Sequence, residues 1–256
     1  MSGLYYVLVK WAPVKHSNDA ILTRNILHFS SRYDADEFYR EIQVLQYNNA
    51  PYFTRLVRSS PQFWCYDSAQ VQEAIHRLFL WNLVSKFKDV VSFANANQAQ
   101  WNSSSNSVTG PDWVGGGSYF IRNRRQPNLY WWVHDTHIHT SEQRRTKFRI
   151  QQVIHSDSGS GCCPPVLIRK DKITVDVIPE TVTSGAVAGG TQFVSIRNSN
   201  SNCLTLTNKP HDWTFEELIN KQVGVRWGNE IPEEKGQARP LLVFMPNGGG
   251  DEWELC

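Results

Sequence analysis

The sequence predicts an α+β N-terminal domain followed by an all-β C-terminal domain. In the first 98 residues, apolar residues at helical spacing alternate with β-rich runs. After residue 117, short β-rich runs follow one another between turns rich in Asn, Gly and Ser, which is typical of an all-β domain. A chain of 256 residues is long enough for two domains of ordinary size.

The first predicted domain, residues 1–98, is a small sheet with two helices. β-rich runs predict strands at residues 4–11, 20–31, 52–57 and 63–66. One helix is expected here, with Ser30, Ser31 and Asp34 as N-cap candidates. The apolar residues that follow share one helical face: Ala35, Phe38, Tyr39, Ile42 and Leu45. Pro51 ends this helical stretch, since the residue before a proline disfavours the helical conformation. Ser68 is a good N-cap for the longest helix, which is expected to extend to Val91.

Residues 99–117 form a predicted linker. Ser, Asn and Gly largely replace apolar residues there, so this stretch buries too little apolar surface to offset the entropy of ordering its backbone. Residues 118–256 are then the second domain.

A strand–turn–strand pattern recurs in this second domain. Gly117–Asn123 and Gly190–Asn198 are similar, and each is followed six residues later by a leucine, Leu129 or Leu204. A weaker copy, Val166–Lys170, lies between them. One hairpin cannot bury its apolar face alone, so three copies predict a threefold arrangement of β-hairpins.

These copies resemble the repeats of β-trefoil proteins, and are similar in particular to ricin-B-type lectins and to the trefoil protease inhibitors of mushrooms. Besides the opening Gly117–Asn123, the resemblance is carried by Leu129–Trp132, Lys147–Ile150 and Asp251–Leu255. It implies a C-terminal β-trefoil that binds carbohydrate, as in a defence-type lectin. Alternatively, loops that project from the trefoil inhibit a protease. Residues 1–98 resemble no family, and we expect them to act in homodimerisation or as an effector.

A carbohydrate site needs an aromatic ring for the apolar face of a sugar and polar side chains for its hydroxyl groups. Both kinds of residue occur in the first and last copies of the pattern. The candidate ligand-binding residues are Asn128, Tyr130, Trp132, Asp212, Trp213, Trp227 and Asn229. We expect a glycan or glycoprotein as the partner, with no cofactor and no catalytic activity.

Two groups of residues favour a hydrolase as a second alternative. His137 and His139, preceded by His134, would share one face of a strand and could bind a metal ion there. The large barrel in which such motifs occur does not fit the rest of the sequence, so we expect a polar hairpin strand without a metal. Cys162 and Cys163 could supply a thiolate nucleophile, but they lack the local signature of a cysteine protease.

Bulk charge argues against nucleic acid as the partner, because 26 Lys and Arg nearly balance 24 Asp and Glu. Locally the balance differs: residues 122–149 include seven basic residues and two acidic ones, interleaved with aromatic residues. Such a pattern suits a single-stranded nucleic acid or an anionic glycan. The acidic residues between positions 211 and 256 are expected to match this charge within the domain or between copies of it.

The sequence contains no run of about 18 apolar residues, so we expect no membrane span. Its first residues lack the features of a secretory signal peptide. We therefore expect a cytoplasmic protein, or one that is exported by a non-classical route. The five cysteines are odd in number and do not form a disulfide framework, which predicts reduced thiols.

Overall fold

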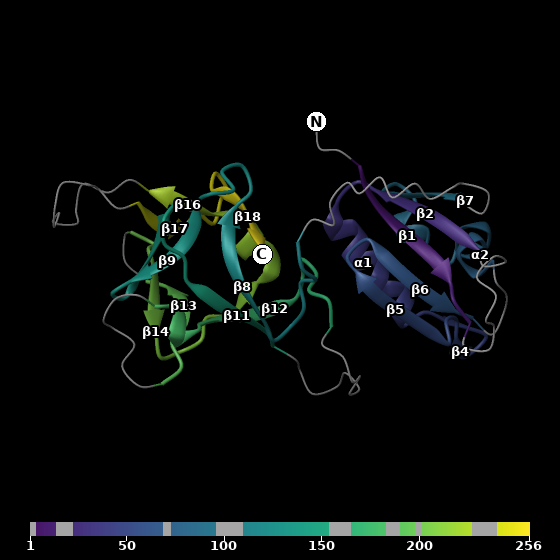
Figure 1. The fold of residues 1–256 in the computed structure, drawn as a ribbon, viewed down its shortest axis with the longest axis horizontal. Helices are drawn as coiled ribbons and strands as arrows, with labels where there is room; N and C mark the ends of the chain where they lie inside the picture. Colours follow the sequence, from purple (N-terminus) through teal and green to yellow (C-terminus); the bar gives the residue numbers. More distant parts are fainter. Residues whose placement is uncertain are drawn as a thin grey trace. The chain divides into compact units, whose positions relative to one another are not determined.

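The chain folds into two units, Met1–Asp112 and Trp113–Cys256 (Figure 1). The structure, a computed structural model, describes residues 4–13, 23–68, 73–95, 110–153, 165–182, 190–197, 201–226 and 240–256. Most of the predicted linker therefore lies outside the described residues. Of its described part, residues 110–112 belong to the first unit and residues 113–117 to the second.

The described residues of the first unit form a five-stranded mixed sheet and one small two-stranded sheet. The five strands are, in order across the sheet, β5 (Arg55–Ser60), β6 (Phe63–Asp67), β1 (Tyr5–Trp11), β2 (Arg24–Phe29) and β7 (Val91–Asn95). The central strand β1 runs antiparallel to β2 and parallel to β6. The small sheet pairs β3 (Gln46–Tyr47) with β4 (Ala50–Pro51).

The helical segments described in this unit are α1 (Arg32–Gln43), α2 (Ala74–Leu80) and the 3₁₀ helix η2 (Ser85–Phe87). Helix α1 begins where the Ser31 side chain accepts a hydrogen bond from the backbone N–H of Asp34. It packs on the sheet, because the ring centroids of Phe38 on α1 and Phe29 on β2 lie 5.4 Å apart.

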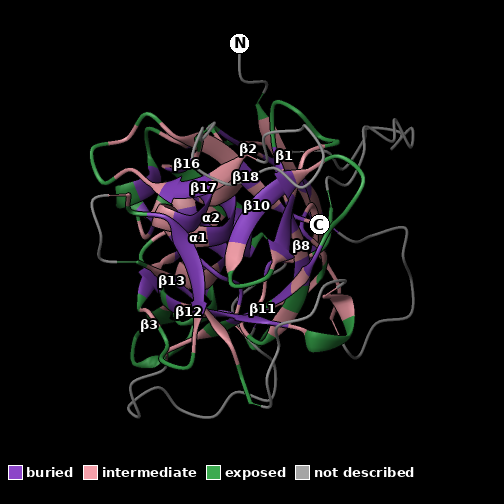
Figure 2. Ribbon diagram, turned by 90° about the vertical axis from the view of Figure 1, so that its left-hand side faces the viewer, coloured by how far each residue is buried: buried purple, intermediate pink, exposed green. Residues whose placement is uncertain are grey.

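Alternate residues of the sheet of the first unit point into its core. Val7 and Val9 on β1, and Leu27 and Phe29 on β2, are fully buried, whereas the residues between them are mostly half-buried. This period of two is that of a strand with one covered face. Figure 2 shows that the buried residues gather in the strands, whereas many turns are exposed.

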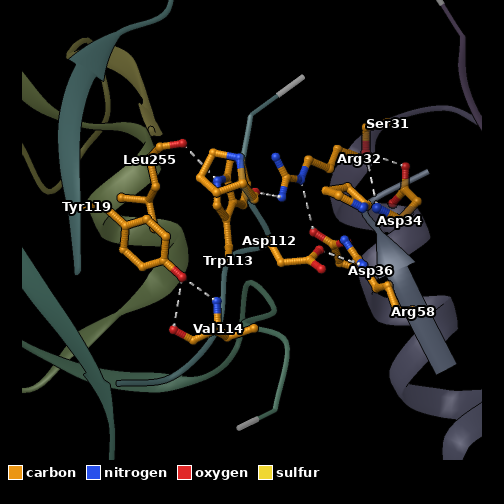
Figure 3. A network of polar contacts seen from close by, with 12 residues as sticks. Ser31, Arg32, Asp34, Asp36, Arg58, Asp112, Trp113, Val114, Tyr119 and Leu255 are labelled. Atoms are coloured by element: carbon orange, nitrogen blue, oxygen red, sulfur yellow. Dashed lines mark hydrogen bonds and ion pairs between the residues drawn. The ribbon is translucent and has the colours of Figure 1, made fainter. Parts of the chain in front are cut away.

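A cluster of buried charges holds the last residues of the first unit (Figure 3). The guanidinium of Arg58 on β5 lies 2.7 Å from the carboxylate of Asp36 on α1 and 2.7 Å from that of Asp112. Arg32 lies 3.5 Å from Asp36 and donates a hydrogen bond of 2.7 Å to the carbonyl oxygen of Pro111. The side chains of Arg58 and Asp36 are only 3% and 1% exposed, so each depends on its charged partners for solvation.

The described residues of the second unit form one antiparallel sheet of eleven strands. In chain order these are β8 (Gly117–Asn123), β9 (Tyr130–His134), β10 (His137–Ser141), β11 (Lys147–Gln152), β12 (Lys172–Val177), β13 (Phe193–Ile196), β14 (Leu204–Thr207), β15 (Trp213–Thr214), β16 (Asn220–Arg226), β17 (Leu241–Phe244) and β18 (Asp251–Leu255). Strand β11 pairs with both β12 and β8, which closes the path of pairing on itself. The helical segments described here are η3 (Pro179–Thr181) and α3 (Phe215–Ile219).

Large aromatic side chains fill the centre of the second unit. Trp131, Trp213 and Trp253 are fully buried. The ring of Trp131 lies 5.6 Å from that of Trp253 and 5.8 Å from that of Phe148. The buried indole N–H of Trp253 donates a hydrogen bond of 2.8 Å to the carbonyl oxygen of Val223, which offsets the cost of removing this polar group from water.

The first residues of the second unit are bound to its own strands (Figure 3). The indole N–H of Trp113 donates to the carbonyl oxygen of Leu255 on β18 at 3.0 Å. The hydroxyl oxygen of Tyr119 on β8 accepts a hydrogen bond of 2.8 Å from the backbone N–H of Val114.

The predicted fold class, an α+β domain followed by a β-trefoil, is wrong, because the described structure as a whole is mostly β and has a large eleven-stranded sheet. The described residues contain three α-helices, and α2 and α3 have only seven and five residues. The long helix expected from Ser68 to Val91 is replaced by α2, a turn, η2 and the start of β7. Asn82 breaks the helical stretch, since its φ of 54° lies in the left-handed region. None of the described helices is both long and apolar enough to cross a membrane.

The predicted threefold repeat also fails in its middle copy. β13 pairs with β14, and β8 pairs with β9, as antiparallel neighbours. By contrast, Val166–Lys170 makes only an isolated bridge between Val166 and Val114. Here the backbone N–H of Ile168 donates to the carboxylate of Asp171, and the N–H of Asp171 donates to the carbonyl of Ile168. These local bonds form a turn in place of a hairpin strand, so the described residues do not contain three equivalent hairpins.

Candidate functional site

Five of the seven predicted sugar-binding residues lie in the part of the chain that the structure describes. Asn128 and Asp212 are exposed, and Tyr130 is half-buried. Trp132 and Trp213 are buried. The other two residues, Trp227 and Asn229, lie outside the described residues, so the predicted site in the last copy is only partly described.

Trp213 belongs to the core of the second unit. Its ring has no exposed surface, and its indole N–H donates to the carbonyl oxygen of Val194 at 3.0 Å. The ring also lies 5.8 Å from that of Phe244. Asp212 next to it is exposed, but the buried indole presents no face on which a sugar could stack.

The hairpin of β9 and β10 brings together the predicted residues of the first copy. Its tight turn contains Asp135, whose φ of 53° is a left-handed conformation that aspartate tolerates better than most residues. Residues that pair across neighbouring strands lie on the same face of the sheet. The pairs on one face are Tyr130 with Ser141, Trp132 with His139, and His134 with His137. We call these six residues the hairpin face.

The opposite side of the same hairpin belongs to the core. Trp131 and Val133 on β9, and Ile138 on β10, are fully buried. The backbone N–H of Val133 donates to the hydroxyl of Thr146, and the N–H of Thr146 donates to the carbonyl of Trp131. One side of the hairpin therefore packs into the core, and the hairpin face lies on its opposite side.

Aromatic rings contact one another along the hairpin face. The rings of Trp132 and His134 stack with centroids 4.9 Å apart and planes inclined by 25°. The ring of His139 lies 6.0 Å from that of Trp132 and 5.8 Å from that of His134. Trp132 and His139 are buried in this group, whereas the side chain of His134 is 25% exposed.

Three basic side chains lie over aromatic rings beside this face. The guanidinium carbon of Arg144 lies 4.9 Å from the ring centroid of Trp132. That of Arg145 lies 4.5 Å from the ring centroid of Phe120 and 5.6 Å from that of Tyr130. The ammonium of Lys147 also lies over Phe120, at 5.5 Å. We call these three residues, Arg144, Arg145 and Lys147, the cationic rim.

The loop before β11 holds the two arginines in place. The hydroxyl oxygen of Ser141 accepts hydrogen bonds from the backbone N–H groups of Gln143 and Arg144, at 3.2 and 3.1 Å. Contact between a guanidinium and an aromatic face adds a further attraction. The arginine side chains are exposed, yet both ends of their loop are bonded to the hairpin.

Three of the other four basic residues of the stretch 122–149 are matched by carboxylates. Arg122 pairs with Glu254 at 2.6 Å and Arg124 with Glu252 at 3.6 Å, which confirms the expected match with the acidic C-terminal residues. Arg149 pairs with Asp176 at 3.8 Å. The cationic rim differs: within the described residues, none of its three side chains forms an ion pair with a carboxylate.

The structure brings the three histidines together but not as a ligand set. The ring centroids of His137 and His139 lie 6.5 Å apart, and no group of three His, Cys, Asp or Glu in the described part of the chain could hold a metal ion. Burial and the positive charge of Arg197 lower the pKa of His137. Cys162 and Cys163 lie outside the described residues.

The sequence pattern did not single out the loop arginines or Phe120 as binding residues. The signal was present, because basic and aromatic residues interleave between positions 122 and 149. What the pattern could not show is which of these basic residues have acidic partners, since Glu252, Glu254 and Asp176 lie far away in the chain.

Comparison with known proteins gives no family to which the chain can be assigned. No known protein family matches its sequence, and no curated protein is similar to it. Inference about function therefore starts from the hairpin face and the cationic rim.

Proposed function

We propose that the second unit binds carbohydrate without catalysing a reaction, and that the hairpin face is its binding surface. The observation that supports this proposal is the combination of aromatic rings and polar groups on one side of the β9–β10 hairpin. Tyr130 and His134 are partly exposed there, and Asn128 is exposed in the turn that leads into β9.

This combination suits the two sides of a sugar. The CH groups of the sugar ring pack against the phenol of Tyr130 and the imidazole of His134. The hydroxyl groups bond to side-chain amides and to ring nitrogen atoms, such as those of Asn128 and His134. Trp132 stacks against the imidazole of His134 and is itself buried, so it supports this ring and offers little surface to the ligand.

The state of the described thiols supports binding over covalent catalysis. A nucleophilic cysteine needs a lowered pKa. Burial raises the pKa of Cys65 and that of Cys256, which moves both thiols away from the reactive thiolate form.

A glycan array probed with the whole protein tests the proposal. We expect binding to at least one class of saccharide, and a loss of about tenfold in affinity for Tyr130→Ala, because the ring that packs against the sugar is removed. Tyr130→Phe should keep most of the affinity, since it keeps the ring.

Tyr47→Ala provides the matched control. This tyrosine lies in the first unit and is similarly half-buried, so its removal should leave glycan binding unchanged. Circular dichroism of each variant checks that the fold is retained. If the wild-type protein binds no saccharide, the proposal is wrong, and inhibition of a protease would then favour the inhibitor alternative.

A further inference from the structure

We infer that the saccharide bound by the hairpin face carries oxyanions, as sulfate or carboxylate groups, and that the cationic rim recognises them. This inference rests on the proposed function and adds the chemical class of the ligand. It is carried by the position of Arg144 and Arg145, two adjacent guanidinium groups that lie over different rings of one surface.

The geometry leaves the hydrogen-bonding capacity of both arginines available. A guanidinium carries five N–H donors, and contact with an aromatic ring does not use them all. These donors match the spacing of two oxygen atoms of a sulfate or carboxylate, and such paired, charge-assisted bonds are among the stronger polar contacts. Within the described residues, neither arginine forms an ion pair with a carboxylate of the protein.

The charge around the rim adds to this preference. Lys147 lies over the same Phe120 ring as Arg145, so three positive charges gather beside the hairpin face. Glu142 is the acidic residue of the loop, and it is exposed and forms no ion pair with the rim in the described part of the chain. The local charge therefore stays positive, although the whole chain carries only +2.

A saccharide fits this surface better than a nucleic acid does. Proteins that bind single strands offer several exposed ring faces on which successive bases stack. Here Arg144 lies over the buried Trp132, and Arg145 lies closer to the ring of Phe120, at 4.5 Å, than to that of Tyr130, at 5.6 Å, so the rings left for a ligand are those of Tyr130 and His134. These two rings suit a sugar unit, while the guanidinium groups suit its anionic substituents.

The test compares four probes on the full chain: heparin, a polymer of uronic acids without sulfate, neutral dextran, and a single-stranded oligonucleotide of comparable length. We expect heparin or the polyuronate to bind at least about tenfold more tightly than the other two, with an affinity that falls as salt rises. A preference for heparin identifies sulfate as the recognised group. Equal binding of both anionic polymers shows that sulfate and carboxylate are recognised alike.

Variants locate the binding. The double variant Arg144→Gln with Arg145→Gln should bind the anionic saccharide at least about tenfold more weakly than the wild-type protein does. Arg144→Lys with Arg145→Lys keeps the charge but not the paired donors, and should recover only part of this loss. Arg124→Gln removes one positive charge, where the double variant removes two, from an exposed arginine that has a carboxylate partner, and should change affinity by less than about threefold.

The possible failures are distinguishable. Binding of neutral glycans as tightly as anionic ones overturns this inference and leaves the proposed function intact. Absence of binding to any saccharide overturns both. If the oligonucleotide binds as tightly as the anionic saccharides or more tightly, the inference of a saccharide ligand is wrong and nucleic acid is favoured. An effect of Arg124→Gln as large as that of the double variant shows that bulk charge, and not the rim, attracts the polymer.

Discussion

His137 shows how the burial of one residue can make the stability of the second unit depend on pH. Its ring is half-buried at the end of the hairpin, next to the hydroxyl of Thr136 and near the positive charge of Arg197. Burial and this charge both disfavour the imidazolium form, which lowers the pKa of His137. Burial likewise lowers the pKa of His211.

The second unit should therefore lose stability on acidification. Below the ordinary histidine pKa of about 6.5, the unfolded chain takes up protons that the folded unit resists, so stability falls as pH drops from there towards the lowered folded pKa. We expect a lower melting temperature at pH 5.5 than at pH 7.5, and a smaller difference for His137→Gln. His76→Gln, at an exposed position of the first unit, is the control, and an equal effect of both variants would contradict the prediction.

Burial is also the property that the sequence conceals at single residues. Trp132, Trp213 and Tyr130 all fit the aromatic half of a sugar site when only their neighbours in the chain are known. Trp213 is buried by Val194 and Phe244, which come from other strands. Since no local pattern reports these contacts, sequence could suggest the set of rings but not which of them reach the surface.

At the scale of elements, the β9–β10 hairpin shows how a turn positions a binding surface. The pairing of His134 with His137 leaves two residues between the strands, and Asp135 takes a left-handed conformation to make this turn. Tight hairpin turns of this kind need positive φ values, for which Gly, Asn and Asp are suited. The turn thereby sets the register that places Trp132 opposite His139.

Substitution of Asp135 tests the role of this backbone conformation. Asp135→Ala should reduce the free energy of unfolding by about 1 kcal/mol, because alanine is strained at positive φ. Asp135→Gly should be close to wild type, since glycine adopts this conformation without strain. Urea unfolding of both variants provides the measurement. Equal stability of the two variants would mean that the left-handed turn is not what limits the hairpin.

Sequence predicted elements well where the determining signals are local. Helix α1 lies close to its predicted place, because its N-cap, Ser31, and its buried apolar face are both encoded within a dozen residues. The prediction of a long helix after Ser68 was wrong because contacts with distant parts of the chain determine the structure of this segment. The apolar residues beyond Asn82 have helical spacing, but they bury themselves against distant partners, and Val91 does so as part of a strand paired with β2.

At the scale of the whole molecule, each unit has its own means of holding the chain near the boundary at Asp112 and Trp113. In the first unit, this is the buried cluster around Arg58, which joins residues that are far apart in the chain. Burial raises the pKa of Asp36, while Arg58 and Arg32 oppose the shift. The carboxylate therefore depends on these guanidiniums to remain charged.

Removal of Arg58 should consequently destabilise the first unit. Arg58→Met leaves Asp36 buried without its closest cation, and we expect a loss of about 3–5 kcal/mol. Hydrogen-exchange mass spectrometry of peptides from α1 and β5 measures this loss locally. Arg55→Met, at an exposed position of the same strand, is the control and should have little effect. Similar exchange in both variants would contradict a stabilising role for the cluster.

The closed path of pairing in the second unit has a consequence for association. Every strand along that path, from β11 through β14 and β17 to β8, has neighbours on both sides. In the first unit, by contrast, β5 and β7 end the five-stranded sheet, and within the described residues each has a partner on one side only. Unsatisfied amide and carbonyl groups at such borders recruit strands from other chains. Self-assembly through the backbone is therefore expected at the first unit, and the proposed binding surface on the second unit stays clear of it.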